Sequence, residues 1–137
     1  MGQQQLLLVI LVTIIVGIAT VIAINTFGNA ADNANIDAVR NDLGSIALAA
    51  QGYYLKPALL SGGDKSFNGF TFKGVSFAGF IPEDAADLII TNENGTFEIT
   101  SAAGNELVVE GTPASDADRT FTATIRANAF EIVESEE

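Results

Sequence analysis

Carboxylates are the side chains of this chain that could do chemistry, because it contains no cysteine and no histidine. It therefore has no thiolate nucleophile, no disulfide, no zinc or haem ligand of the usual kinds, and no side chain that ordinarily titrates near neutral pH. Paired carboxylates can act as general acid and base, but among 17 acidic residues such pairs arise by chance. We expect neither an enzyme nor a cofactor.

Aspartates in predicted loops are the candidates for cation binding, since Ca²⁺ and Mg²⁺ prefer oxygen ligands. Their spacing matches no regular ligand pattern, so no metal site is expected. These residues are Asp64, Asp84, Asp87, Asp116 and Asp118.

The charge balance argues against nucleic acid as a partner. The net charge is −11, and the six basic residues form no cluster in the sequence. Phosphate binding needs clustered Lys and Arg. We expect no nucleic-acid partner.

Asn94-Gly95-Thr96 matches the N-glycosylation pattern, which makes Asn94 a weak candidate for modification. Asn-Gly also favours a tight hairpin, because both residues tolerate positive φ. The hairpin alone is a sufficient explanation of the dipeptide.

The elements that must position any site begin with an uncharged N-terminus, because no charged side chain precedes Asp32. Leu6 to Ile24 is apolar except for Thr13, Gly17 and Thr20. A helix over this range is roughly 29 Å long, close to the ~30 Å hydrocarbon thickness of a bilayer. Because apolar residues cover every face, the helix must lie in lipid or among other helices.

Three interpretations of this segment remain open. The first is a cleaved secretory signal. Such a signal has a basic n-region and a shorter apolar stretch, whereas residues 1–5 contain no Lys or Arg; residues 29–31 nevertheless resemble a cleavage site. A simple signal anchor is the second interpretation. The third depends on the residues that follow the segment.

An amphipathic helix is predicted to follow, with one apolar stripe at helical spacing. Pro57 ends it, so we expect one helix from about Gln4 to Leu55. The stripe consists of Ile36, Val39, Leu43, Ile46, Ala50 and Tyr53.

The junction at residues 25–29 is a weak helix former, and Gly28 costs about 1 kcal/mol relative to Ala. Two explanations stay open for it. One is a kink or local melting of the helix, and the other is the boundary between membrane and water.

Five of the nine phenylalanines fall between residues 67 and 80. Phe70 and Phe72 alternate as in a strand, and we expect this segment to supply the core of a small domain rather than to bind a ligand. A turn or one short helical turn is predicted at 81–86.

The rest of the chain predicts an antiparallel meander, with a polar loop at 111–118 and an acidic end at 134–137. The predicted strands are 87–91, 96–101, 106–110, 119–126 and 130–133.

The predicted fold class is α+β: a long N-terminal helix, apolar in its first half and amphipathic in its second, packed on a small antiparallel sheet. We expect three parts, namely an apolar helix half at 1–31, an amphipathic half at 32–57 and a β-meander head domain at 58–137. The residues predicted to pack helix on sheet are Ile36, Val39, Leu43, Ile46 and Tyr53.

This arrangement resembles the type IV pilins and pseudopilins. Gly2-Gln3 resembles the processing site of that family, and Leu6 to Ile24 resembles its polymerisation helix. The resemblance implies that a prepilin peptidase cuts between Gly2 and Gln3, and that an assembly machinery moves the subunit from the cytoplasmic membrane into an extracellular filament of identical subunits.

The helices of many copies would form the filament core in such an assembly. The implied core residues are Gln5, Leu6, Leu7, Val9, Ile10, Leu11, Ile14, Ile15, Gly17, Ile18, Val21 and Ile22.

The chain departs from the family at two positions. Gln3 and Leu7 stand where the family usually has a hydrophobic residue and a Glu. Gln3, Gln4 and Gln5 could instead supply neutral hydrogen bonds in the core, and burying these amides would cost less desolvation than burying an ion pair. Alternatively, these glutamines mark the polar membrane interface.

A second hypothesis is a single-pass anchored domain outside the cytoplasm. In that case the Phe-rich segment or the loop at 111–118 would contact a ligand.

Overall fold

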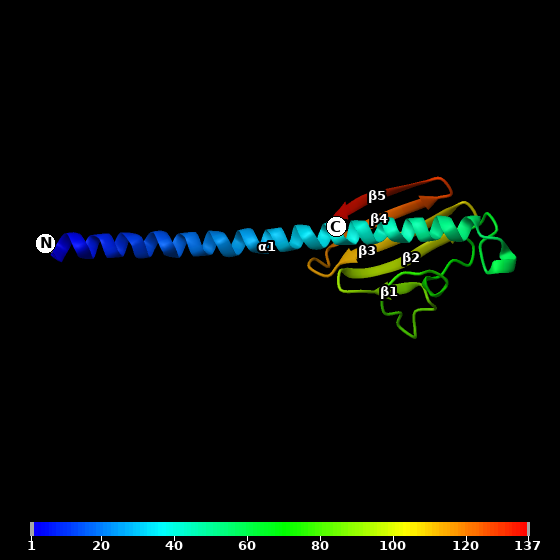
Figure 1. Ribbon diagram of the computed structural model, residues 1–137, viewed down its shortest axis with the longest axis horizontal. Coiled ribbons are helices and arrows are strands. Elements are labelled where there is room, and N and C mark those ends of the chain that lie inside the picture. The colour runs from blue at the N-terminus through cyan, green and yellow to red at the C-terminus, as the bar shows by residue number, and fades with distance from the viewer. Residues whose placement is uncertain (1, 137) are drawn as a thin grey trace. The chain divides into compact units, whose positions relative to one another are not determined.

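The computed structural model describes residues 2–136 and divides the chain into two compact units, one ending at Ala34 and the other beginning at Asn35. Figure 1 follows the elements along the chain. They are α1 (Gly2–Leu55), the 3₁₀ turns η1 (Ala58–Leu60) and η2 (Phe72–Gly74), β1 (Ile89–Thr91), β2 (Gly95–Ala103), β3 (Glu106–Pro113), β4 (Arg119–Arg126) and β5 (Ala129–Glu136).

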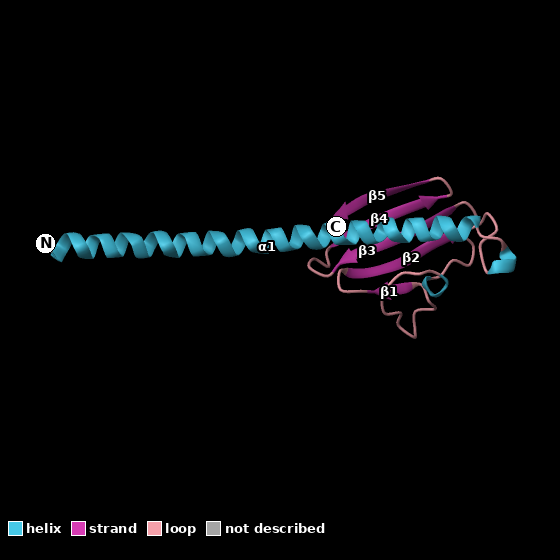
Figure 2. Ribbon diagram, in the orientation of Figure 1, coloured by secondary structure: helices cyan, strands magenta, loops and turns pink. Residues whose placement is uncertain are grey.

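The five strands form one sheet in the order β1-β2-β3-β4-β5, and every neighbouring pair is antiparallel (Figure 2). This is the predicted meander, and the α+β class is confirmed. The register sets Phe97 opposite Gly111 and Gly111 opposite Phe121. Side chains alternate between the two faces along each strand, and residues directly opposite on neighbouring strands point to the same face, so these three residues share one face of the sheet.

The core of the second unit lies between that face and the part of α1 from Asn35 onward. Val39, Leu43 and Ile46 are fully buried, and Ile36 is 6% exposed. The predicted stripe therefore lies against the sheet. The sheet side consists of Ile90, Phe97, Ile99, Leu107, Val109, Phe121, Ala123 and Ile125.

Gly111 gives the helix room to approach the sheet. A Cβ at this position would lie 3.2 Å from Leu43 Cδ1 and 3.1 Å from Phe97 Cδ1. Such contacts are tighter than ordinary packing, so a side chain here would press on the helix.

The loop after α1 returns over the end of the helix and caps it. The amide of Gly63 donates to the Tyr53 carbonyl at 2.8 Å, and the amide of Lys65 donates to the Tyr54 carbonyl at 2.7 Å. The last carbonyls of a helix have no partner within it, so these bonds satisfy them. The loop thereby fixes where the Phe-rich segment begins.

The Phe-rich segment is core but not strand. Phe67, Phe70 and Phe72 are 0–1% exposed, as the core interpretation predicted. The predicted strand alternation of Phe70 and Phe72 is wrong, because Phe70 closes a turn and Phe72 begins η2. Loop backbone can bury alternate aromatics when turns rather than pleating orient them. The turn predicted at 81–86 is present, but it lies at 83–87.

The Asn94-Gly95 hairpin prediction is wrong in its mechanism. Neither residue has positive φ. Instead the side-chain oxygen of Asn92 accepts the amides of Asn94, at 2.9 Å, and Gly95, at 3.1 Å. Gly95 is required for another reason: a Cβ there would lie 2.1 Å from the Thr112 carbonyl oxygen.

Several predicted boundaries also move. Strand β1 begins at Ile89 rather than at residue 87, because residues 83–87 form a turn, and β2 runs from Gly95 to Ala103 rather than over 96–101. Strand β3 extends to Pro113, so the loop before β4 is 114–118 rather than 111–118. Strand β5 extends to Glu136, so Glu134 belongs to the sheet rather than to a solvated acidic end.

Residues 25–29 are helical, so the local melting considered above is not present.

Candidate assembly surface

The N-terminal part of α1 exposes its apolar side chains on every face. Every described residue from Gly2 to Ala34 is exposed. The large apolar residues of the predicted assembly core are 53–67% exposed, and Gln5 and Gly17 are also exposed. Within residues 2–136, α1 is the one helix long and apolar enough to cross a membrane, and none of its apolar window is buried. The large residues are Leu6, Leu7, Val9, Ile10, Leu11, Ile14, Ile15, Ile18, Val21 and Ile22.

The hydroxyls in this apolar surface are internally satisfied. Thr13 donates to the Val9 carbonyl at 2.7 Å, and Thr20 donates to the Val16 carbonyl at 2.8 Å. Both bonds span four residues along the helix, a pairing that hides a hydroxyl in apolar surroundings. Neither hydroxyl then needs water, so lipid or another apolar helix can cover this surface.

Gly17 makes a local gap in the side-chain layer. A Cβ at Gly17 would meet nothing within 4 Å, so no side chain among residues 2–136 fills that space. Small residues in apolar helices allow a second helix to approach the backbone closely. Gly17, like Gly28, is therefore a place in this unit where a neighbouring helix can pack closely.

The predicted processing residues lie at the start of α1. The helix begins at Gly2, and Gln3, Gln4 and Gln5 are exposed. Among the described residues, no hydrogen bond is recorded for the side chains of these three glutamines. Their amides can therefore bond to water, to lipid headgroups or to another chain.

The second unit uses its helical stripe internally. Ile36, Val39, Leu43 and Ile46 are covered by the sheet. Tyr53 is partly buried, with its ring edge-on to Phe70 at 5.3 Å between centroids and its hydroxyl donating to the Asn68 carbonyl at 3.1 Å.

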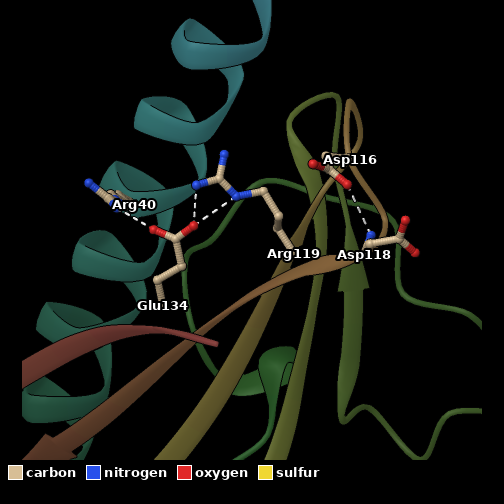
Figure 3. A network of polar contacts seen from close by, with 5 residues as sticks. All are labelled: Arg40, Asp116, Asp118, Arg119 and Glu134. Atoms are coloured by element: carbon tan, nitrogen blue, oxygen red, sulfur yellow. Dashed lines mark hydrogen bonds and ion pairs between the residues drawn. The ribbon is translucent and has the colours of Figure 1, made fainter. Parts of the chain in front are cut away.

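A charged network that the sequence analysis missed joins this helix to the last two strands. The Glu134 carboxylate accepts Arg40 Nη2 at 3.2 Å and Arg119 Nε at 2.7 Å, and it also accepts Arg119 Nη2 (Figure 3). The Arg40 guanidinium also lies 4.9 Å from the centre of the Phe121 ring. No local signal could reveal it, because Arg40 and Glu134 are 94 residues apart.

Asn94 is engaged in a second polar cluster. Its side-chain amide donates to the Asp42 carboxylate at 2.8 Å, and Asn92 donates to the same oxygen at 2.8 Å. Asn35 donates to the Asn94 carbonyl at 2.9 Å. The nitrogen that would carry a glycan is thus occupied and partly buried in the folded domain.

The loop aspartates do not gather into a ligand set. Within residues 2–136, no group of three or more acidic side chains is placed to hold a metal ion. Asp116 instead accepts the Asp118 amide at 3.1 Å, as Figure 3 shows, and Asp87 pairs with Lys73 at 3.9 Å.

The comparisons with known proteins add no relative. No protein-family model, curated protein or solved structure matches this chain.

Proposed function

We propose that this chain is the structural subunit of an extracellular helical filament of the type IV pilus kind, with the apolar helices of many copies packed side by side in its core. The observation that supports this most is the contrast within α1. Residues 2–31 expose an uncharged apolar surface on every face, whereas the stripe from Ile36 to Ile46 is already covered by the sheet.

The exposed helix needs two successive environments in this proposal. The bilayer holds the precursor, since an apolar surface of this length matches the hydrocarbon core. In the filament, neighbouring helices replace the lipid. That exchange gains little from hydrophobicity, so close packing at Gly17 and Ala19 and van der Waals contact must drive it.

The charge distribution suits a filament surface. All 17 acidic and six basic residues lie at Asp32 or beyond, so residues 32–137 carry the whole net charge of −11. A high charge of one sign keeps protein surfaces soluble at high density. The β domain would face water, and the helix core would carry no like-charge repulsion.

Maturation would follow the family that the chain resembles. A prepilin peptidase would cut between Gly2 and Gln3, and a pilus-type machinery would extract the subunit from the cytoplasmic membrane. The exposed side-chain amides of Gln3, Gln4 and Gln5 would then hydrogen-bond between neighbouring helices, in place of the ion pair that a Glu forms with a neighbour's N-terminal amine in the pilins that the chain resembles.

Electron microscopy of sheared cell-surface material tests the proposal. Helical filaments are expected from the unaltered chain, and Ile14→Lys or Gly17→Leu should abolish them. The first change places a charge in the packed core, and the second fills the gap at Gly17. Thr100→Lys is the matched control, because it adds the same charge to an exposed position on β2.

The outcomes separate the proposal from an anchored binding domain. If the unaltered chain remains monomeric in the membrane fraction, as the substituted chains do, the filament proposal is contradicted. The binding alternative draws its support from Phe80, which is 69% exposed while Phe67, Phe70 and Phe72 are buried. Ligand binding by the detergent-solubilised chain that is lost in Phe80→Ala would favour that alternative.

A further inference from the structure

Two Asn-Gly dipeptides occur in the second unit, and their surroundings differ. They are Asn68-Gly69 and Asn94-Gly95. In any Asn-Gly pair, the backbone nitrogen of the glycine can attack the asparagine side chain, because glycine has no Cβ to hinder the approach. Whether this occurs depends on how freely the two groups move and on how easily the nitrogen loses its proton.

Asn68-Gly69 is exposed and sits at the tip of a tight turn. The amide of Phe70 donates to the Phe67 carbonyl at 3.0 Å, and Gly69 has φ +78° at the third position of the turn. This is the type II arrangement, which favours glycine there. Among the described residues, no hydrogen bond is recorded for the Gly69 amide or for the Asn68 side chain.

Tyr53 acts on the peptide bond between these two residues. Its hydroxyl donates to the Asn68 carbonyl at 3.1 Å. That carbonyl shares its peptide bond with the Gly69 nitrogen, so a donor there stabilises the negative charge that appears when the nitrogen loses its proton. The bond makes Gly69 a better nucleophile.

Asn94-Gly95 is held in the opposite way. The Asn94 side-chain amide donates to Asp42 at 2.8 Å, and the Gly95 amide donates to Asn92 Oδ1 at 3.1 Å. Gly95 is also buried, with the Thr112 carbonyl close against it. Both reacting groups are therefore already bonded, and attack requires local opening of the hairpin.

We propose that Asn68 is a site of spontaneous deamidation in the folded protein, with the Gly69 nitrogen as nucleophile, Tyr53 as the group that activates it, and water as the second reactant. The Gly69 nitrogen loses its proton and bonds to Asn68 Cγ. The bond from Cγ to Nδ2 breaks, and ammonia leaves with that proton. Water then opens the cyclic imide at either carbonyl, leaving aspartate or β-linked isoaspartate.

The product alters the packing of the domain as well as its charge. Each conversion adds one negative charge to an acidic chain. The isoaspartate form inserts an extra carbon into the backbone between Phe67 and Phe70, which are 0% and 1% exposed. Long-lived copies of this protein should therefore accumulate a loosened turn at this place. The inference does not depend on filament formation.

Peptide mapping by mass spectrometry tests the proposal on the full chain in detergent, incubated at mildly alkaline pH. In the folded protein, Asn68 should convert at least about tenfold faster than Asn94, because Asn94 reacts only through opened states. In denaturant the two sites should convert at similar rates. Equal rates in the folded protein, or faster conversion at Asn94, would overturn the proposal.

Two variants test the assigned contacts. Tyr53→Phe keeps the ring against Phe70 but removes the hydrogen bond to the Asn68 carbonyl. It should slow the deamidation of Asn68 at least about threefold in the folded protein, since it removes a single hydrogen bond, and should not slow it in denaturant. Asp42→Ala should raise the deamidation rate of Asn94 and leave the deamidation rate of Asn68 unchanged. Circular dichroism establishes that each variant is folded. An unchanged Asn68 rate in folded Tyr53→Phe would overturn the role of Tyr53, and if a variant does not fold, the comparison of the two sites in the unaltered chain still decides.

Discussion

The two parts of α1 differ in how their apolar side chains are arranged and in whether they are buried. From Asn35 onward it has a narrow apolar stripe, and the sheet of the same chain covers that stripe. Up to Ala34 it is apolar on all sides over most of its length, and its described residues are all exposed. The first pattern specifies folding within the chain, whereas the second requires partners outside it.

The largest expected difference between the two parts is in folding stability. Leu43→Ala should lower the free energy of unfolding of the second unit by about 2–5 kcal/mol, because it leaves a cavity beneath the helix. Leu11→Ala removes the same atoms from an exposed position and should change the free energy of unfolding of the second unit by less than about 0.5 kcal/mol. Denaturant unfolding in detergent, followed by circular dichroism, measures both.

Similar losses for the two substitutions would contradict this division of the helix. So would a normal filament yield from Leu11→Ala combined with Ile15→Ala, because both residues belong to the proposed core.

A smaller effect should sharpen the account of what holds helix to sheet. Glu134→Gln replaces the carboxylate that contacts both Arg40 and Arg119 with a neutral amide, and it should lower the free energy of unfolding by about 1–2 kcal/mol at low salt. The loss should shrink as salt is added, since these groups are partly exposed. Glu93→Gln removes the same charge at an exposed loop position and is the control. A salt-independent loss would show that packing rather than charge is responsible.

The smallest effect concerns the outer face of the sheet. Glu98 and Glu110 are direct cross-strand partners, and like charges so placed are destabilising. Glu110→Lys should therefore raise the free energy of unfolding by about 0.2–1 kcal/mol. Glu131→Lys, at an exposed position on β5, controls for the change in net charge. Equal gains from both would attribute the effect to net charge alone.

Much of the fold could be predicted from sequence because its signals are local. The spacing of Ile36, Val39, Leu43 and Ile46 predicted the buried stripe, and alternation predicted the β-meander. The strand assignment at Phe70 and Phe72 failed because turns, not pleating, place these rings in the core.

The polar contacts could not be predicted because they join distant segments. Glu134 lies in an acidic run that suggests a solvated end, but strand pairing carries it to Arg119 and Arg40. Likewise Asn94 matches a hairpin and a glycosylation pattern, whereas its side chain in fact bonds to Asp42. The sequence did indicate the apolar surface at 6–24, since that surface depends on composition alone.

We propose that the final partners of the apolar helix are the same helices of other copies of this chain. Electron cryomicroscopy of native material sheared from the cell surface tests this most directly. The account predicts filaments with residues 2–31 of many copies packed side by side along the axis and the β domains outside. Recovery of the protein solely as single copies in membranes, or filaments whose core excludes these helices, would contradict it.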